Sequence, residues 1–152
     1  MPSVVQPFML SIIIPVYNTS LSFLENMMTS LNTNRPGSTE IIIVDDGSNA
    51  TVRSKLEEFS SIYNDVIVIH QRHQGQNQAR KQGLKYANGE YVLFCDSDDI
   101  LIWNKMVGII SILTRRHADA IVFNSEMICE SKVRSGYGNS QFTKKECSYD
   151  IK

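Results

Sequence analysis

Apolar residues in this chain form short continuous runs that are separated by more polar segments and turn residues. Five of these runs are rich in β-branched side chains and predict strands: Leu10 to Val16, Glu40 to Val44, Val66 to Ile69, Tyr91 to Cys95 and Ala120 to Phe123. In several of them apolar residues follow one another without alternation, which is typical of strands covered on both faces. The pattern therefore predicts a parallel sheet.

The segments between these runs carry an apolar residue every three or four positions, which predicts helices. The predicted helices are Leu21 to Leu31, Val52 to Ile62, Gln76 to Ala87 and Trp103 to Leu113. Alternation of strand and helix predicts an α/β fold with a mostly parallel sheet and helices on both faces. Ligands of such sheets bind at the carboxyl ends of the strands, so the residues directly after each strand are candidate site residues.

Composition fits one soluble domain whose charges are balanced. The 152 residues include 42% hydrophobic and 20% charged side chains, and the net charge is -1. That balance gives no general attraction to nucleic acid or to an anionic membrane. No apolar stretch reaches the roughly 18 residues of a spanning helix, and the start MPSVVQPF does not resemble a signal peptide.

Three cysteines, Cys95, Cys129 and Cys147, are widely spaced and form no CxxC pair. This argues against a disulfide framework or a zinc site and favours a reducing compartment. Cys95 lies in an apolar run and is expected to be a small buried side chain.

We expect three parts along the chain. Residues 1–8 form a flexible arm and residues 9–125 the sheet domain. Residues 126–152 form a polar tail, which we expect to be a loop, a short hairpin or the beginning of a further region.

Two predicted strands end in residues suited to contact a nucleotide. After the first strand, Pro15 closes the ladder and Tyr17 could lie flat against a base, although a turn with a half-buried tyrosine gives the same pattern. After the second strand, Asp45 and Asp46 precede Gly47. One carboxylate could accept from a pyrimidine N–H or from ribose hydroxyls, or the stretch is an ordinary turn that caps the next helix.

The fourth predicted strand ends in three carboxylates within four positions, Asp96, Asp98 and Asp99. Alternate carboxylates can hold a hard cation such as Mg2+ or Mn2+, whose remaining ligands come from water and a diphosphate. The alternative is a helix cap before Trp103. Arg80, on the preceding predicted helix, could contact a phosphate or hold an aspartate in place.

Several classes of nucleotide-binding protein are excluded by motifs that the sequence lacks. There is no GxGxxG after the first strand and no GxxxxGK[ST] anywhere, which argues against a dinucleotide-binding dehydrogenase and a P-loop ATPase. A response-regulator receiver needs an aspartate after its third strand, where this chain has Gln71 and Arg72. A sugar-nucleotide pyrophosphorylase needs a Gly-rich, Arg-containing loop where Pro15 to Asn18 stand.

Four stretches in order, "SIIIPVYN", "EIIIVDDGS", "GQNQARKQGLKYANGEYVLFCDSDD" and "DAIVFN", strongly resemble the family 2 glycosyltransferases of the GT-A fold. The match covers roughly Met9 to Ser125 and corresponds to the nucleotide-sugar-binding half of that family. Each motif alone is weak, and four in the same order are specific.

The resemblance implies a donor site for a nucleotide diphosphate sugar, most often a UDP-sugar. Pro15, Val16 and Tyr17 would frame the base. Asp46 would hydrogen-bond the uracil, and Asp45 would lie beside it at the strand end.

The resemblance also implies a DxD motif made of Asp96 and Asp98. Asp96 would reach the ribose and the waters of the metal, Asp98 would bind Mn2+ or Mg2+ directly, and Asp99 would lie behind them. Arg80 matches the arginine of the family's "ARN" stretch and would help hold the nucleotide pocket, although Lys81 replaces the usual asparagine.

The activity implied is inverting transfer of a sugar to the hydroxyl of a saccharide or lipid-linked acceptor, in cell-surface polysaccharide synthesis. A general base would deprotonate that hydroxyl, and a metal would stabilise the leaving diphosphate. The residues after Asp99 contain no credible match to the family's general base. The alternative is therefore a truncated or non-catalytic nucleotide-sugar-binding module. The expected location is the cytoplasm, with peripheral association at the inner face of the membrane left open.

Overall fold

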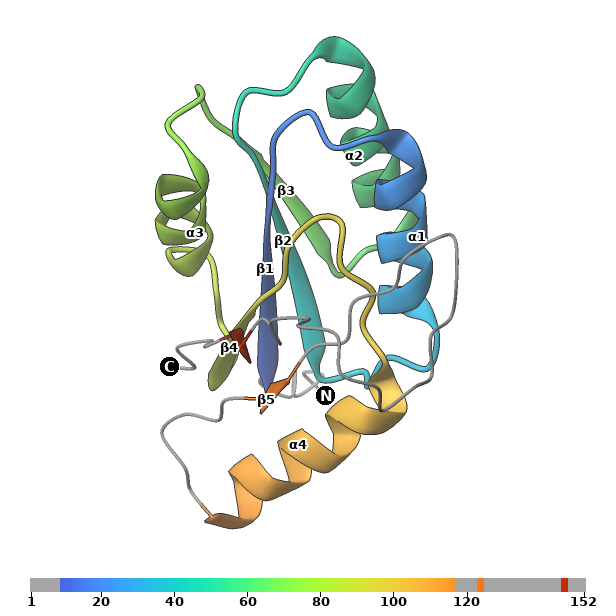
Figure 1. Cartoon of the computed structure of the whole chain (residues 1–152), viewed down its shortest axis with the longest axis vertical. Helices are drawn as coiled ribbons and strands as arrows, with labels where there is room; N and C mark the ends of the chain where they lie inside the picture. The colour runs from blue at the N-terminus through green and yellow to red at the C-terminus, as the bar shows by residue number, and fades with distance from the viewer. Residues whose placement is uncertain (1–8, 117–122, 125–145, 148–152) are drawn as a thin grey trace, which may run out of the picture.

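Strand β1 (Leu10–Val16) lies between two neighbours in a parallel sheet of the order β3-β2-β1-β4 (Figure 1). In this computed structural model, which describes residues 9–116, 123–124 and 146–147, the other strands of that sheet are β2 (Thr39–Asp45), β3 (Val66–His70) and β4 (Tyr91–Phe94). All their pairings are parallel, so every strand ends at the same edge of the sheet. The predicted α/β fold is confirmed.

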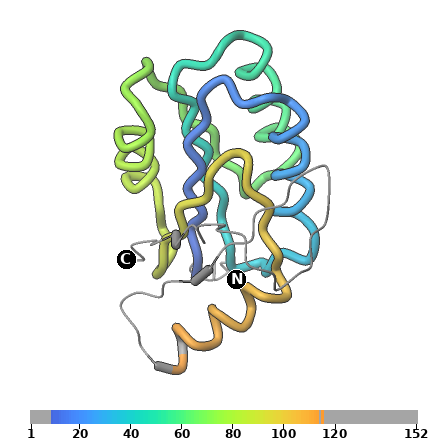
Figure 2. Tube along the Cα trace, in the orientation of Figure 1, coloured from blue at the N-terminus to red at the C-terminus, as the bar shows by residue number. Residues whose placement is uncertain are grey.

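Helices cover both faces of the sheet, as Figures 1 and 2 show. The helices are α1 (Leu21–Asn32), α2 (Ala50–Ile62), α3 (Gln76–Leu84) and α4 (Trp103–Arg116). Helices α1, α2 and α4 share one large apolar cluster with the sheet, and α3 packs in a smaller cluster on the opposite face.

Consecutive residues of β1 contribute to different clusters. Ile12 and Ile14 pack with α1 and α2, whereas Ile13 packs with Ala79 of α3. All are completely buried. Side chains of a strand point alternately to its two faces, so a strand covered on both faces needs an unbroken apolar run. This explains why the sequence of β1 lacks alternation.

The four predicted helices are present, and their ends differ from the prediction by a few residues. The largest differences are at two helix ends: α4 ends at Arg116 instead of Leu113, and α3 ends at Leu84 instead of Ala87. There Lys85 N donates to Gln82 O and Tyr86 N to Gly83 O, so the last turn tightens to i,i+3 hydrogen bonds and stops.

The fifth predicted strand does not extend the parallel sheet where it is described. Phe123 lies in β5 (Phe123–Asn124), which pairs antiparallel with β6 (Glu146–Cys147). Residues 120–122 of that prediction, the arm of residues 1–8 and most of the tail lie outside the described residues, so the expected division of the chain stays a prediction.

A buried carboxylate ties the strands together at the edge where they begin. Glu40 is 2% exposed and accepts from Ser11 Oγ and from Asn88 N at 2.6 Å. Ser11 Oγ in turn accepts from Gly89 N at 2.8 Å. Through these bonds the turn before β4 is fixed to β1 and β2.

We expect Gly89→Ala to lower the free energy of unfolding by about 1–3 kcal/mol, the usual cost of overpacking. A Cβ at this position would lie 2.6 Å from Ser11 N and 2.7 Å from Ser11 Oγ, and the backbone of β1 cannot move aside. Denaturant unfolding measures the effect. Gly37→Ala is the control, because nothing lies within 4 Å of its Cβ. Equal stability of the two variants would contradict this packing.

Candidate functional site

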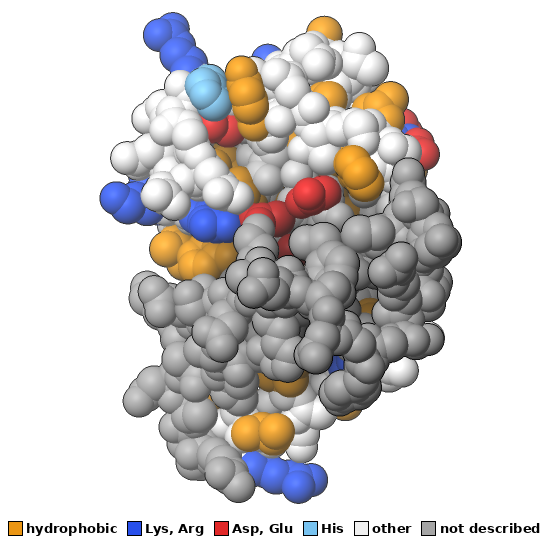
Figure 3. Space-filling view, viewed as in Figure 1, with side chains coloured by type: hydrophobic (Ala, Val, Ile, Leu, Met, Phe, Trp, Pro, Cys, Tyr) orange, Lys and Arg blue, Asp and Glu red, His pale blue; other side chains and the backbone are white. Residues whose placement is uncertain are grey.

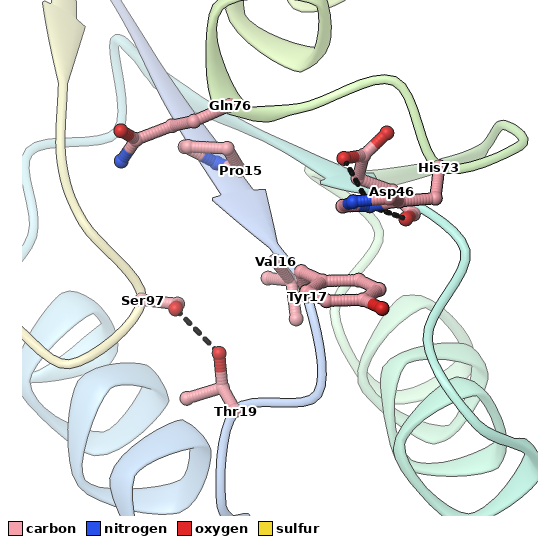
Figure 4. A pocket seen from close by; sticks show the side chains of 8 residues that line it. All are labelled: Pro15, Val16, Tyr17, Thr19, Asp46, His73, Gln76 and Ser97. Atoms are coloured by element: carbon pink, nitrogen blue, oxygen red, sulfur yellow. Dashed lines mark hydrogen bonds and ion pairs between the residues drawn. The ribbon is translucent and has the colours of Figure 1, made fainter.

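A pocket of about 260 Å³ opens at the edge of the sheet where the strands end (Figure 4). This volume is just below the ~300–1,000 Å³ that is usual for small-molecule sites. The pocket can therefore hold one part of a ligand, and the rest of the ligand would lie on the open surface. Its lining comes from the ends of β1, β2 and β4 and from the start of α3: Pro15, Val16, Tyr17, Thr19, Asp46, His73, Gln76 and Ser97.

Tyr17 presents an exposed aromatic face in this pocket. Its side chain is 50% exposed and stacks on the ring of His73, with centroids 4.0 Å apart and planes 25° apart. Pro15 and Val16 line the wall beside it. The three residues that sequence reasoning placed around a base therefore lie together, although base binding itself stays a prediction.

The carboxylate of Asp46 organises the loop between β3 and α3. Its Oδ1 accepts from Gln71 Nε2 at 2.6 Å and from Gln74 N at 2.8 Å. Its Oδ2 accepts from Gly75 N at 2.8 Å and lies 2.9 Å from His73 Nδ1. Burial raises the pKa of Asp46, but these hydrogen bonds outweigh burial and hold the pKa below its ordinary value of 3.8.

Gly47 lets this loop approach β2 closely. Its φ is +80°, and a Cβ there would lie 2.8 Å from His73 N. A side chain would therefore be strained by the backbone conformation and would also displace His73. The Asp-Gly pair of the sequence thus serves a close contact between two loops as well as a turn.

Asp45 does not line the pocket. It is 1% exposed; its Oδ1 accepts from Ser48 N and its Oδ2 lies 2.8 Å from His70 Nδ1. Burial raises the pKa of Asp45, and the hydrogen bonds from Ser48 and His70 outweigh it, so the pKa is lowered. The structure thus gives Asp45 the turn-closing role that the sequence left open as an alternative, and contact with a donor stays a prediction.

The acidic turn after β4, which consists of Asp96, Ser97, Asp98 and Asp99, is held by contacts from helix α3 and from the loop after β1. Asp96 Oδ1 accepts from Gln76 Nε2 and from Arg80 Nη2, both at 2.8 Å. Ser97 Oγ lies 2.6 Å from Thr19 Oγ1, as Figure 4 shows. These contacts from α3 and from the loop after β1 fix the turn in place.

Asp98 is the exposed carboxylate of the acidic turn and makes no hydrogen bond or ion pair with another described residue. The carboxylate of Asp99 is turned toward the backbone of the acidic turn, because its Oδ2 accepts from Asp96 N at 3.3 Å. In Figure 3, acidic and basic side chains lie next to each other near the middle of the face shown. This turn thus presents one carboxylate outward.

Of the two roles considered for Arg80, the structure shows contact with an aspartate. The guanidinium pairs with Asp96 and lies 5.7 Å from the ring centroid of Phe94. Its Nε is buried and has no partner among the described residues. Arg80 thereby fixes one oxygen of Asp96.

The acidic turn suits a divalent metal that a substrate completes. Carboxylate oxygens are the ligands that Mg2+ and Mn2+ prefer, and the outward carboxylate of Asp98 supplies one. Within the described residues, no group of three or more His, Cys, Asp and Glu side chains is arranged to hold an ion. A metal here would therefore need further ligands from water or phosphate.

Cys95 is 3% exposed, which confirms the expected buried side chain, and it forms no disulfide with another described residue. Burial raises the pKa of Cys95, and the negative charges of Asp99, Asp96 and Asp98 raise it further. The thiol therefore stays protonated and supports the strand end as an apolar side chain.

Sequence reasoning missed four residues that line the pocket: Thr19, His73, Gln76 and Ser97. Each lies within a few residues of a strand end or at the start of α3, so position along the chain could have indicated them. Their pairing across 78 residues, as in Thr19 with Ser97, could not be inferred from spacing.

The model of the family described as "Glycosyl transferase family 2" matches residues 11–146. The chain belongs to this family. Among its relatives, the putative glycosyltransferase EpsH of Bacillus subtilis (strain 168) is 38% identical over 89 residues, which is 59% of this chain and 26% of EpsH. Another relative is the Escherichia coli protein named UDP-Glc:alpha-D-GlcNAc-diphosphoundecaprenol beta-1,3-glucosyltransferase WfgD. It is 30% identical over 126 residues, which is 83% of this chain and 49% of WfgD.

Solved structures agree with this membership. S. aureus TarS 1–349 in complex with UDP has a TM-score of 0.65 and 28% identity, and the match covers 74% of this chain and 34% of TarS 1–349. GalNAc-T7 with UDP, GalNAc and Mn2+ has a TM-score of 0.54 and 29% identity, over 60% of this chain and 18% of GalNAc-T7.

The chain spans 18–38% of the length of the first three curated relatives that it matches. Most of each of those proteins therefore lies outside the match with this chain. None of the helices in the described residues is long and apolar enough to cross a membrane.

We expect Asp46→Asn to lower the free energy of unfolding at pH 7 by about 1–3 kcal/mol, because the amide replaces an acceptor of four donors. Folding lowers the pKa of Asp46 below 3.8 and so favours its ionised form. The stability from this group is complete above that pH and is lost as the pH falls through the lower, folded pKa.

Urea unfolding between pH 2 and about pH 5 measures this effect, and Asp46→Asn should show a shallower loss of stability with falling pH than the wild type. Asp98→Asn is the matched control, because Asp98 is exposed and has no described partner. An unchanged pH dependence in Asp46→Asn would contradict the role of this carboxylate.

Proposed function

We propose that this chain binds the nucleotide diphosphate sugar donor, UDP-sugar, of an inverting glycosyltransferase and presents it to an acceptor hydroxyl. The observation that carries the proposal is the juxtaposition of an aromatic pocket and an acidic turn on one edge of the sheet. Gln76 links the two, because it lines the pocket and donates to Asp96. Such an edge suits a ligand with a planar base at one end and a diphosphate at the other.

The base is proposed to lie against Tyr17, with Pro15 and Val16 as the wall of the pocket. Tyr17 is half-exposed, and aromatic rings stack on planar rings at little entropic cost. Asp45 and Asp46 stay part of the proposal as residues that hold the surrounding loops, and direct contact of Asp46 with uracil would require a base to replace one of its present donors. TarS 1–349 was crystallised with UDP, which supports uracil as the base.

The diphosphate is proposed to lie over the acidic turn with a divalent ion, Mn2+ or Mg2+. Asp98 would hold the ion, and Asp96, fixed by Arg80 and Gln76, would hold its waters or the ribose. Such an ion supplies Lewis-acid stabilisation of the charge on the leaving diphosphate. GalNAc-T7 was crystallised with UDP and Mn2+, which supports a metal of this kind.

The acceptor is proposed to be a saccharide or a lipid-linked saccharide of cell-surface polysaccharide synthesis. The name of WfgD specifies a diphosphoundecaprenol-linked acceptor, and such an acceptor would place the reaction at the cytoplasmic face of a membrane. Of the carboxylates after Asp99, Glu146 lies in β6, and Asp119, Glu126, Glu130 and Asp150 lie outside the described residues. The identity of the general base is therefore not part of the proposal.

A second candidate function is a nucleotide-sugar-binding module that does not catalyse transfer. The observation that favours it is that none of the described residues after Ser97 lines the pocket, so the described part of the chain supplies residues on the donor side. Release of UDP from a UDP-sugar by the 152-residue chain would exclude this candidate.

We expect the wild-type chain to bind UDP more tightly with Mn2+ than without it, and Asp98→Asn to weaken Mn2+-dependent binding about 10- to 100-fold. The reason is that the substitution removes the outward carboxylate of the acidic turn. Isothermal titration calorimetry with UDP, at saturating Mn2+ and with chelator, measures both effects.

Glu90→Gln is the matched control, because Glu90 is an exposed acid directly before β4, at the opposite edge of the sheet. It should bind UDP as the wild type does. No Mn2+-dependent binding of UDP by the wild type would overturn the proposed function.

A further inference from the structure

We propose that Asn88 is a latent deamidation site, which the folded turn before β4 keeps unreactive and whose conversion stops that turn from closing again. Asn88-Gly89 is the one Asn-Gly pair among the 152 residues. Because glycine has no Cβ, it leaves its own backbone nitrogen open to the side chain of the asparagine before it. The pair lies at the edge of the sheet where β4 begins, away from the pocket, and the inference is independent of the proposed function.

The reaction takes place within the chain and consumes only water. Hydroxide from the solvent removes the proton of Gly89 N, and this nitrogen attacks Cγ of Asn88. The new N–Cγ bond closes a cyclic imide, while the Cγ–Nδ2 bond breaks and Nδ2 takes a proton from water and leaves as ammonia. Water then adds to one of the two imide carbonyls and opens the ring, which gives aspartate or isoaspartate.

Packing explains why this reactive pair occupies the turn. A Cβ at position 89 would lie 2.6 Å from Ser11 N, so only glycine fits. Glu40 is 2% exposed, and a buried carboxylate needs hydrogen-bond donors. Asn88 supplies two of them, since its backbone N donates to Oε1 at 2.6 Å and its Nδ2 lies 3.3 Å from Oε2. The turn thus uses both members of the pair.

The same contacts hold both reacting groups in place. Gly89 N donates to Ser11 Oγ at 2.8 Å, so the proton that must leave is held in a hydrogen bond and the peptide plane is fixed against β1. The leaving group, Nδ2 of Asn88, donates to Tyr86 O at 2.9 Å as well as to Glu40. Asn88 is exposed, so lack of water does not prevent the reaction. The attack therefore requires local opening of the turn.

Either product opposes closure of the turn. Aspartate replaces the donor Nδ2 with an anionic oxygen, where Nδ2 now lies 3.3 Å from Glu40 Oε2. Two carboxylates at such a distance repel each other, and Glu40 is almost completely buried. Isoaspartate adds one atom to the backbone between positions 88 and 89, which moves Gly89 N away from Ser11 Oγ. Conversion is therefore a one-way step that follows opening.

The step affects β4, the strand that leads to the acidic turn. In the described sheet this strand of four residues pairs only with β1. Its first residue, Tyr91, donates from N to Met9 O at 3.0 Å, two positions after Gly89. Loss of the turn removes the support at the beginning of β4. Deamidation thus converts a brief opening of this sheet edge into a permanent one.

The first test incubates the full chain in mildly alkaline buffer, folded and in urea, and follows Asn88 by mass spectrometry of the tryptic peptide 86–105. Fragment ions separate Asn88 from Asn104 in the same peptide. The folded chain should deamidate at Asn88 at least about 10-fold more slowly than the unfolded chain, because it reacts only from the open turn. A synthetic peptide of residues 84–91 is the control and should react equally fast with and without urea. Equal rates for the folded and the unfolded chain would overturn the inference.

The second test compares Asn88→Asp, which is one of the two products, with Asn88→Ala, which removes the amide without adding a charge. Urea unfolding at neutral pH should give Asn88→Asp a folding equilibrium constant about 10-fold lower than that of Asn88→Ala. In a Glu40→Gln background this difference should disappear, because the repelling charge is absent. If Asn88→Asp is as stable as Asn88→Ala, or if the difference survives Glu40→Gln, conversion does not act through Glu40 and the inference fails.

Discussion

All four strands of the main sheet run in the same direction, and the rest of the structure depends on this constraint. Because they are parallel, the loops that follow β1, β2, β3 and β4 leave the sheet at one edge. The helices that return the chain must cover the two faces, and the strands are therefore apolar on both sides. Polar residues gather where the strands end because the core excludes them.

Burial separates the carboxylates of this chain into two kinds. Glu40, Asp45 and Asp46 are buried, and each accepts hydrogen bonds from its own chain, since a buried charge without partners would be costly. They connect loops and strands. Asp98 is exposed and has no described partner, so its oxygens are open to a cation. Buried carboxylates of the sheet thus have a structural role, whereas the exposed carboxylate of Asp98 can bind a ligand.

Much of the fold could be predicted from the sequence because it depends on local patterns. The bounds of β1 agree with the apolar run from Leu10 to Val16, and Gly47 has the positive φ that an Asp-Gly turn suggests. The end of α3 was misplaced, because its last turn closes with i,i+3 bonds that no periodicity indicates. Phe123 lies in a strand as predicted, but its antiparallel partner, Cys147, lies in the tail, where the pattern predicted no long element.

The sequence by itself determined the order of strands and helices and the positions of Tyr17, Asp46, Arg80, Asp96 and Asp98 after or near the strand ends. Only the tertiary structure decided which of these carboxylates accept hydrogen bonds from the protein itself and which are free to bind a ligand. The donors to Asp46 come from residues 25 to 29 positions further along the chain. His73 meets Tyr17 only because two loops converge at the same edge. The physical reason is that a carboxylate accepts hydrogen bonds from groups that are near it in space. Which groups are near it depends on how the helices and loops pack against the sheet.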